Sequence, residues 1–143
     1  MKKIFAAVFA VVMFFAQFVS AYAPEGHLFV TMIDVGQGDS FLIETPTQNV
    51  LVDTGDTDSA VANKLQDIGI ERLEKIILTH PHADHIGSIA GVLDNFDVDL
   101  ICDDGRISNS PFVKSYRTSS VTVTNLKTGD ILERVGKVHF CET

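Results

Sequence analysis

The chain has 143 residues, the length of one domain or of part of one. It carries 11 Lys and Arg residues against 19 Asp and Glu residues, which gives a formal net charge of −8. This acidic balance argues against a protein that grips nucleic acid through a strongly basic surface, so any phosphate chemistry would have to depend on metal ions. The simplest role of the acidity is solubility.

The first 21 residues are predicted to be a secretory signal peptide. Two lysines precede an apolar run from Ile4 to Val19, and small residues follow. Cleavage after Ala21 would leave an exported domain, residues 22–143, that is secreted or held at the cell surface or in the periplasm. The alternative is an uncleaved membrane anchor, although a spanning helix needs about 20 apolar residues and this run falls a little short. We expect no other transmembrane segment.

Three short strands are predicted after this segment. Their residues are mostly apolar or β-branched, and turn-forming residues separate them, including the glycines of "VGQGD". Short turns between consecutive strands produce an antiparallel sheet. The expected strands are 28–35, 40–44 and 50–52.

A helix is predicted next. Three apolar residues recur at helical spacing: Val61, Leu65 and Ile68. Asp58 or Ser59 can cap its first turn, and Gly69 stands where a helix would end.

The strand "LEKIILTH", residues 73–80, follows that helix and leads into a second helical pattern. The residues expected on one face of this second helix are Ile86, Ile89, Ala90 and Leu93. Three histidines therefore fall on a strand-to-helix connection, which is where an α/β sheet places its ligands.

Further short strands are predicted in the last third of the chain, at residues 98–104, 119–126 and 136–143. Cys102 and Cys141 lie in two of them. They are compatible with one disulfide in an oxidising compartment, and equally with two buried thiols, so their pairing stays open.

The segment "HPHADH" has the composition of a metal-binding loop. His80 and His82 flank Pro81, whose fixed φ keeps the link extended, so both imidazoles can face one side. Asp84 and His85 begin the helix, where the turn can direct their side chains to a second ligand position nearby. Imidazole and carboxylate ligands suit zinc or a similar transition metal. Packing is a poor explanation for this density, because buried unpaired imidazoles are costly.

This segment resembles the H-x-H-x-D-H motif of the metallo-β-lactamase superfamily. Upstream, "MIDVGQGDSFLIE" and "NVLVDTG" are similar to its competence-type (ComEC-like) exported branch. The resemblance implies an α/β fold, the αβ/βα sandwich, of which this chain would supply about the N-terminal half. It also implies two zinc ions per complete domain, one bound by His80 and His82 and the other by Asp84 and His85. Asp84 would additionally orient a bridging hydroxide.

The resemblance assigns supporting roles to other residues. Asp53 of "DTG" would fix a ligand imidazole or the loop backbone; the alternative is an Asx turn before the helix. Asp39 and Gln37 of "VGQGDS" would contact the site, although the glycines there serve the turn in any case. The family's remaining ligands come from its C-terminal half. His27 and His139 are better interpreted as ordinary terminus and strand residues.

The resulting expectation is an exported zinc-dependent hydrolase that cleaves phosphodiester or related phosphate-ester bonds through a metal-bound hydroxide. Its substrate would be a small-molecule or nucleic-acid phosphodiester. One alternative is hydrolysis of a carbonyl substrate, namely a lactam, a lactone or a thioester. Another is a truncated remnant or binding module without catalysis. The metal's identity, the physiological substrate and the oligomeric state stay open.

Overall fold

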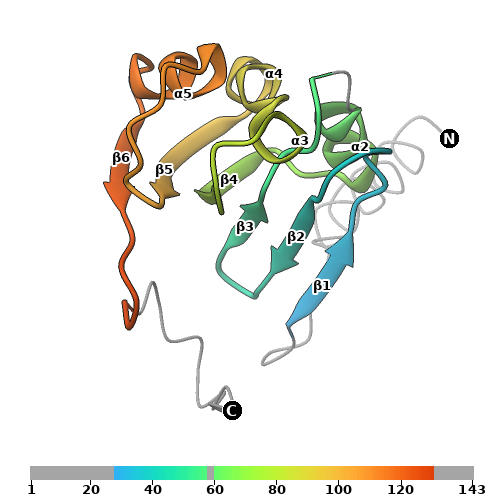
Figure 1. The fold of residues 1–143 in the computed structure, drawn as a ribbon. Helices are drawn as coiled ribbons and strands as arrows, with labels where there is room; N and C mark the ends of the chain where they lie inside the picture. The colour runs from blue at the N-terminus through green and yellow to red at the C-terminus, as the bar shows by residue number, and fades with distance from the viewer. Residues whose placement is uncertain (1–27, 58–59, 131–143) are drawn as a thin grey trace, which may run out of the picture.

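The computed structural model describes residues 28–57 and 60–130 (Figure 1). The predicted signal peptide, the capping pair Asp58 and Ser59, and the predicted strand 136–143 lie outside these ranges. The strands are β1 (Phe29–Met32), β2 (Phe41–Glu44), β3 (Asn49–Val52), β4 (Arg72–Ile77), β5 (Asp97–Asp103) and β6 (Thr122–Asn125). The helices are α2 (Val61–Ile68), α3 (Ala83–Ile86), α4 (Ile89–Asn95) and α5 (Pro111–Arg117).

The six strands form one mixed sheet in the order β1-β2-β3-β4-β5-β6. β1, β2 and β3 pair antiparallel, which confirms the predicted meander. β3, β4, β5 and β6 pair parallel, with Val52 opposite Ile77 and Ile77 opposite Cys102. The carboxyl ends of the parallel strands therefore lie at one edge of the sheet, where open α/β sheets bind their ligands.

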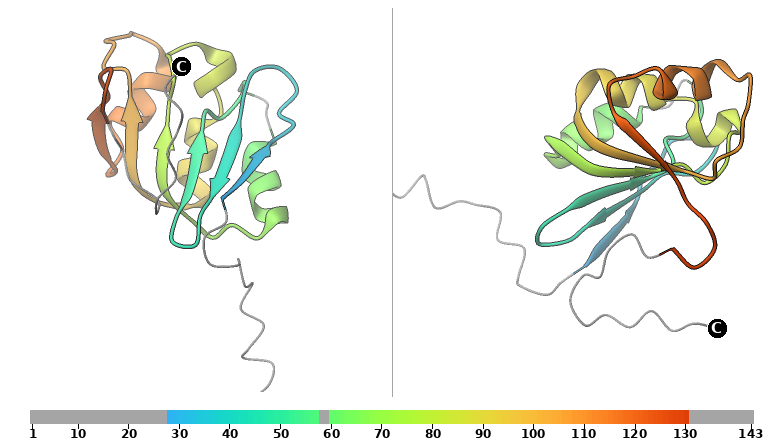
Figure 2. Two further views of the ribbon diagram at one scale, coloured as in Figure 1. Left: turned by 90° about the horizontal axis from the view of Figure 1, so that it is seen from below. Right: turned by 90° about the vertical axis from the view of Figure 1, so that its left-hand side faces the viewer.

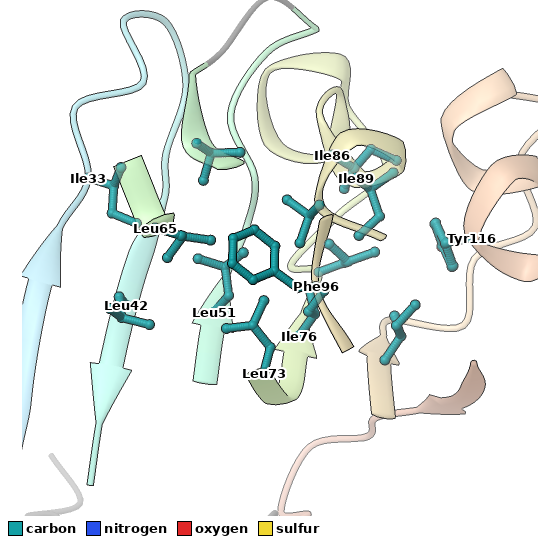
Figure 3. Packing of buried hydrophobic residues seen from close by; sticks show 14 of the residues in the cluster. Ile33, Leu42, Leu51, Leu65, Leu73, Ile76, Ile86, Ile89, Phe96 and Tyr116 are labelled. Carbon is teal, nitrogen blue, oxygen red and sulfur yellow. The ribbon is translucent and has the colours of Figure 1, made fainter. Parts of the chain in front are cut away.

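The helices gather on one face of the sheet (Figure 2). The hydrophobic core lies between them and the strands (Figure 3). Its fully buried aliphatic side chains from the strands are Leu42, Leu51, Leu73, Ile76 and Ile101, and those from the helices are Val61, Leu65, Ile86, Ile89 and Val92. Over residues 28–57 and 60–130, none of the helices combines the length and the apolar character that crossing a membrane requires.

α2 contains the three predicted apolar residues and ends where predicted. Gly69 ends the helix in left-handed backbone, with φ of 93°, and its N–H donates to carbonyls of the last turn. Ile68, the third residue of the helical pattern, is 45% exposed. The reversal at Gly69 directs the next residue, Ile70, into the core in its place, and the Ile70 N–H donates to the Leu65 carbonyl at 3.0 Å. The N-cap position is Ala60, which offers no capping side chain.

The second predicted helix is divided into α3 and α4 at Gly87 and Ser88. The Ser88 hydroxyl donates to the Asp56 carbonyl oxygen at 2.5 Å, which bends the chain onto the connection between β3 and α2. This bend changes the helical phase, so Val92 is buried, and Ala90, which was predicted to share a face with Ile86 and Ile89, is exposed.

α5 is the element that the sequence patterns did not predict. The Ser110 hydroxyl accepts a hydrogen bond from the Phe112 N–H at 3.3 Å, and Pro111 occupies the first helical position. Its buried residues are Val113 and Tyr116. The helix is anchored to the carboxyl end of β5, beside the histidine segment.

Candidate metal centre

The histidine segment connects β4 to α3 at the carboxyl edge of the sheet. Beyond the end of β4, the Leu78 N–H donates to the Cys102 carbonyl at 2.8 Å, so the chain continues beside β5 before it turns. His82 has extended backbone, with φ of −87° and ψ of 149°, and is the N-cap of α3. Asp84 and His85 therefore stand in the first turn of α3, at the strand-to-helix position expected from the sequence.

The four predicted ligand side chains lie in one small cluster. The His80 ring centroid is 4.5 Å from that of His82 and 4.0 Å from that of His85. A carboxylate oxygen of Asp84 lies 3.9 Å from Nε2 of His85. His82 is exposed and the other three residues are half-buried, so the cluster is open to solvent on one side.

Asp53 supports this cluster from the end of β3. Its side chain is buried, and its Oδ1 accepts from the Thr79 backbone N–H at 2.8 Å. Its Oδ2 lies 2.6 Å from the Thr79 hydroxyl and 2.8 Å from Nδ1 of His85. Asp53 thus contacts both an imidazole and the loop backbone, and these contacts link the end of β3 to the segment that follows the neighbouring strand β4.

The backbone after Asp53 holds α3 in place. The Thr54 N–H donates to the His85 carbonyl oxygen at 2.6 Å, and the Gly87 N–H donates to the Gly55 carbonyl oxygen at 2.9 Å. A Cβ at Gly87 would lie 2.5 Å from the Thr57 backbone nitrogen, so only glycine permits this approach. His85 is therefore held at its imidazole ring by Asp53 and at its backbone carbonyl by the Thr54 N–H.

The loop between β1 and β2 contacts the same segment through its backbone. Gly38 has φ of 94°, and a Cβ there would lie 1.7 Å from the Asp84 carbonyl oxygen. The Asp39 carbonyl oxygen accepts from the Gly55 N–H at 3.1 Å. The side chains of Asp39 and Gln37, which the resemblance placed at the site, belong to exposed residues. The loop thus reaches the site at Gly38.

The donor chemistry of the cluster fits zinc. Nδ1 of His80 contacts the Thr79 hydroxyl at 3.0 Å and Nδ1 of His85 contacts Asp53, so neither contact uses Nε2 of the ring. Metal-binding histidines have this arrangement, with the second ring nitrogen hydrogen-bonded to a carboxylate or another polar group. In the part of the chain that the structure describes, no three histidine, cysteine, aspartate or glutamate side chains are placed so that they could together hold a metal ion. The cluster offers suitable donors without a closed coordination shell.

A second buried carboxylate stands at the end of β5. Asp103 accepts a hydrogen bond from the Tyr116 hydroxyl at 2.8 Å and pairs with the guanidinium of Arg117, which joins α5 to the site edge. Burial, followed by this hydrogen bond to Asp103, raises the pKa of Tyr116 to about 12.

Neither Thr79 nor the Asp103 cluster was singled out from the sequence. For Thr79 the available signal was a hydroxyl residue immediately before the first motif histidine. For Asp103 it was an acidic residue at the end of an apolar strand, eight residues before a proline that begins a helix.

The chain is thus an α/β protein with a mixed sheet and with helices on one face of it. Its histidine-rich loop lies at the carboxyl edge of the parallel strands, where a metal site would be expected. Residues 33–134 match the family model of the metallo-beta-lactamase superfamily, and the chain belongs to this superfamily of metal-dependent hydrolases.

The chain is also similar to named members of the superfamily's competence branch. It is 31% identical over 146 residues to ComE operon protein 3 of Bacillus subtilis (strain 168), covering 85% of this chain and 19% of that protein. It is 38% identical over 72 residues to the competence protein ComA of Neisseria gonorrhoeae, covering 48% of this chain and 10% of that protein. The chain therefore spans a fifth or less of the length of these two relatives. The predicted branch is confirmed.

Two further similarities are informative. Over 65 residues the chain is 34% identical to the exodeoxyribonuclease WalJ of Streptococcus pneumoniae serotype 2 (strain D39), covering 44% of this chain and 24% of that protein. The solved structure of the metallo-beta-lactamase SMB-1 matches with a TM-score of 0.55 at 20% identity, covering 76% of this chain and 47% of that one. The structural match confirms the fold, with this chain corresponding to about half of a metallo-beta-lactamase domain.

Proposed function

We propose that this chain is the metal-binding part of an exported, zinc-dependent hydrolase that acts on phosphodiester or related phosphate-ester bonds. The observation that carries the proposal is the cluster of His80, His82, Asp84 and His85. The buried carboxylate of Asp53 supports this cluster through its contact with His85. The phosphate substrate is favoured by the similarity to a relative named as an exodeoxyribonuclease.

The cluster divides into two pairs of metal ligands. His80 and His82 would hold one zinc ion, and Asp84 and His85 would hold the other. Bound zinc supplies a nucleophile at neutral pH, because it lowers the pKa of a coordinated water to about 7. In the chain itself, Asp53 orients the His85 imidazole. The Asp84 carboxylate would orient the water that a bound metal activates.

The acidic composition of the chain is consistent with this use of metal. The exported part, residues 22–143, has 9 basic and 19 acidic residues once Lys2 and Lys3 are removed. Divalent ions would therefore supply the positive charge that a phosphodiester requires, in place of a basic surface.

Zinc titration of the purified chain tests the metal assignment. We expect His82→Ala to weaken zinc binding at least about tenfold, as the loss of a metal partner does. His27→Ala, which changes a histidine outside the motif, should leave zinc binding unchanged. Equal zinc affinity in His82→Ala and the unaltered chain would remove this residue from the site.

Hydrolysis should be measured on this chain and on the full open reading frame that contains it. Substrates that separate the reaction classes are a generic phosphodiester, a lactone and the lactam nitrocefin. We expect cleavage of the phosphodiester, abolished by His82→Ala. Preferential cleavage of the lactam or the lactone would establish carbonyl hydrolysis in its place. An absence of both zinc binding and hydrolysis would leave a non-catalytic remnant.

Export is tested separately. Expression with its own first residues, followed by N-terminal sequencing of the secreted product, should show Tyr22 as the new first residue. Retention in the membrane at full length would establish the anchor.

A further inference from the structure

We infer that Thr79 is a positioning residue that extends the effect of Asp53 to His80, so that one buried carboxylate sets the ring tautomer of both His80 and His85. That this arrangement prepares the two histidines for metal binding rests on the proposed function. The arrangement itself is a property of the metal-free chain.

The inference starts from the contacts of Asp53. Its Oδ2 lies 2.6 Å from the Thr79 hydroxyl and 2.8 Å from Nδ1 of His85, and its Oδ1 accepts from the Thr79 N–H. A carboxylate only accepts hydrogen bonds, so both groups that face Oδ2 must donate. His85 therefore carries its proton on Nδ1, which leaves the lone pair of Nε2 free.

The Thr79 hydroxyl transmits the same constraint to His80. A hydroxyl has one proton to donate, and its contact with the carboxylate is shorter than its contact with Nδ1 of His80, at 2.6 Å against 3.0 Å. Charge-assisted hydrogen bonds to a carboxylate are the shorter and stronger ones, so the proton points to Asp53. The hydroxyl oxygen must then accept from Nδ1 of His80, and that ring also has its free lone pair on Nε2.

The two histidines thus receive the same tautomer by different routes. His85 receives it directly and His80 receives it through one hydroxyl, while the two ring centroids lie 4.0 Å apart. In the proposed metal site these rings belong to different ions. One carboxylate would therefore prepare both ions' binding positions before any metal arrives, and Thr79 is required for only one of them.

Nuclear magnetic resonance of the ¹⁵N-labelled, metal-free chain at pH 8 tests this inference, because histidine ring nitrogens report their tautomer directly. We expect both His80 and His85 to be protonated at Nδ1, with assignments made from His80→Gln and His85→Gln variants. Protonation of His80 at Nε2 in the unaltered chain would overturn the inference without any change at Thr79.

Three substitutions separate positioning from a general structural effect. Thr79→Val removes the hydroxyl at nearly constant volume, so His80 should become a mixture of tautomers while His85 keeps its Nδ1 proton. Thr79→Ser restores the hydroxyl and should restore the His80 tautomer. Asp53→Asn should disturb both rings. An unchanged His80 signal in Thr79→Val, or in Thr79→Ala if the valine variant does not fold, would contradict the role of Thr79.

Zinc titration of the same variants gives a second measurement. We expect Thr79→Val to bind zinc about tenfold more weakly than Thr79→Ser, the size of effect seen when a partner of a metal-binding histidine is removed. If His80 and His85 are both protonated at Nδ1 but the chain binds no zinc, the result would support this inference and contradict the proposed function. Equal affinities in the two variants, alongside normal zinc binding, would contradict the inference alone.

Discussion

Asp53 and His85 are joined by a 2.8 Å contact between Oδ2 and Nδ1, although 32 residues separate them in the sequence. Asp53 makes this contact from left-handed backbone, with φ of 57°, and it is the one non-glycine residue with positive φ among those that the structure describes. Its conformation and its hydrogen bonds therefore depend on each other, and substitutions can separate the two contributions.

Asp53→Ala should lower the free energy of unfolding by about 2–4 kcal/mol, because it strands buried donors and places a Cβ-bearing residue without a stabilising side chain in left-handed backbone. Asp53→Asn should cost less, about 1–2 kcal/mol, since asparagine tolerates this conformation and keeps one acceptor oxygen. Urea denaturation of the two variants measures the difference. An alanine variant as stable as the asparagine variant would mean that the side-chain contacts contribute nothing.

Gly38→Ala should be far more damaging than Gly36→Ala. Both glycines have positive φ, of 94° and 75°, so both substitutions carry the cost of left-handed backbone, about 1–2 kcal/mol. Only the Cβ at Gly38 meets another group, the Asp84 carbonyl oxygen at 1.7 Å, whereas the Cβ at Gly36 has open space. Thermal unfolding should separate the pair, and zinc binding should weaken in the Gly38 variant only. Equal melting temperatures would contradict the contact.

Alkaline pH should destabilise the chain through Tyr116. Its pKa is raised from the ordinary value of 10.0 to about 12, so between these values the folded chain retains a proton that the unfolded chain has lost. The free energy of unfolding should therefore decrease as the pH rises from about 10 to about 12. Urea denaturation across this range measures the slope, and Tyr116→Phe should have a shallower slope because the titrating group is gone. Identical slopes would exclude Tyr116 as a source of the effect.

Cys102 should react slowly with thiol reagents while the chain is folded. Its side chain is buried, and burial raises the pKa of its thiol, with Asp103 adding to the shift and Lys75 opposing it. In a Cys141→Ser variant we expect slow modification in buffer and rapid modification in urea, because the thiolate is the reactive form. Equal rates in both conditions would contradict burial. Counting thiols in the unaltered oxidised chain settles whether Cys102 pairs with Cys141.

Much of the fold was predictable because local patterns determined it. The meander was marked by apolar strands and glycine turns, and Gly69 ended α2 as expected. Ile68 and Ala90 were grouped by their spacing with residues that are buried, yet both are exposed, because spacing alone does not show where a chain reversal or a bend changes the helical phase. α5 was missed because seven residues with two buried positions give too short a period to detect.

The candidate site divides in the same way. The histidine cluster was recognisable because its ligands lie within six residues of one another. The roles of Thr79 and Gly38 were not recognisable, since each depends on a contact with a residue 26 or 46 positions away, between Thr79 and Asp53 or between Gly38 and Asp84. Such contacts are tertiary, and no local pattern encodes them.

The parallel register of β3 and β4 has a consequence for how this chain tolerates change. Val52 lies opposite Ile77, and the next residues along each strand, Asp53 and Leu78, lead directly into the site. Because side chains alternate between the faces of a sheet, a one-residue deletion within either strand would turn the Asp53 carboxylate away from the imidazole it supports. Lengthening or shortening the turn between β2 and β3, where Pro46 and Thr47 are exposed, would preserve that alignment. Natural variation in length should therefore accumulate in such connections and be absent from these two strands.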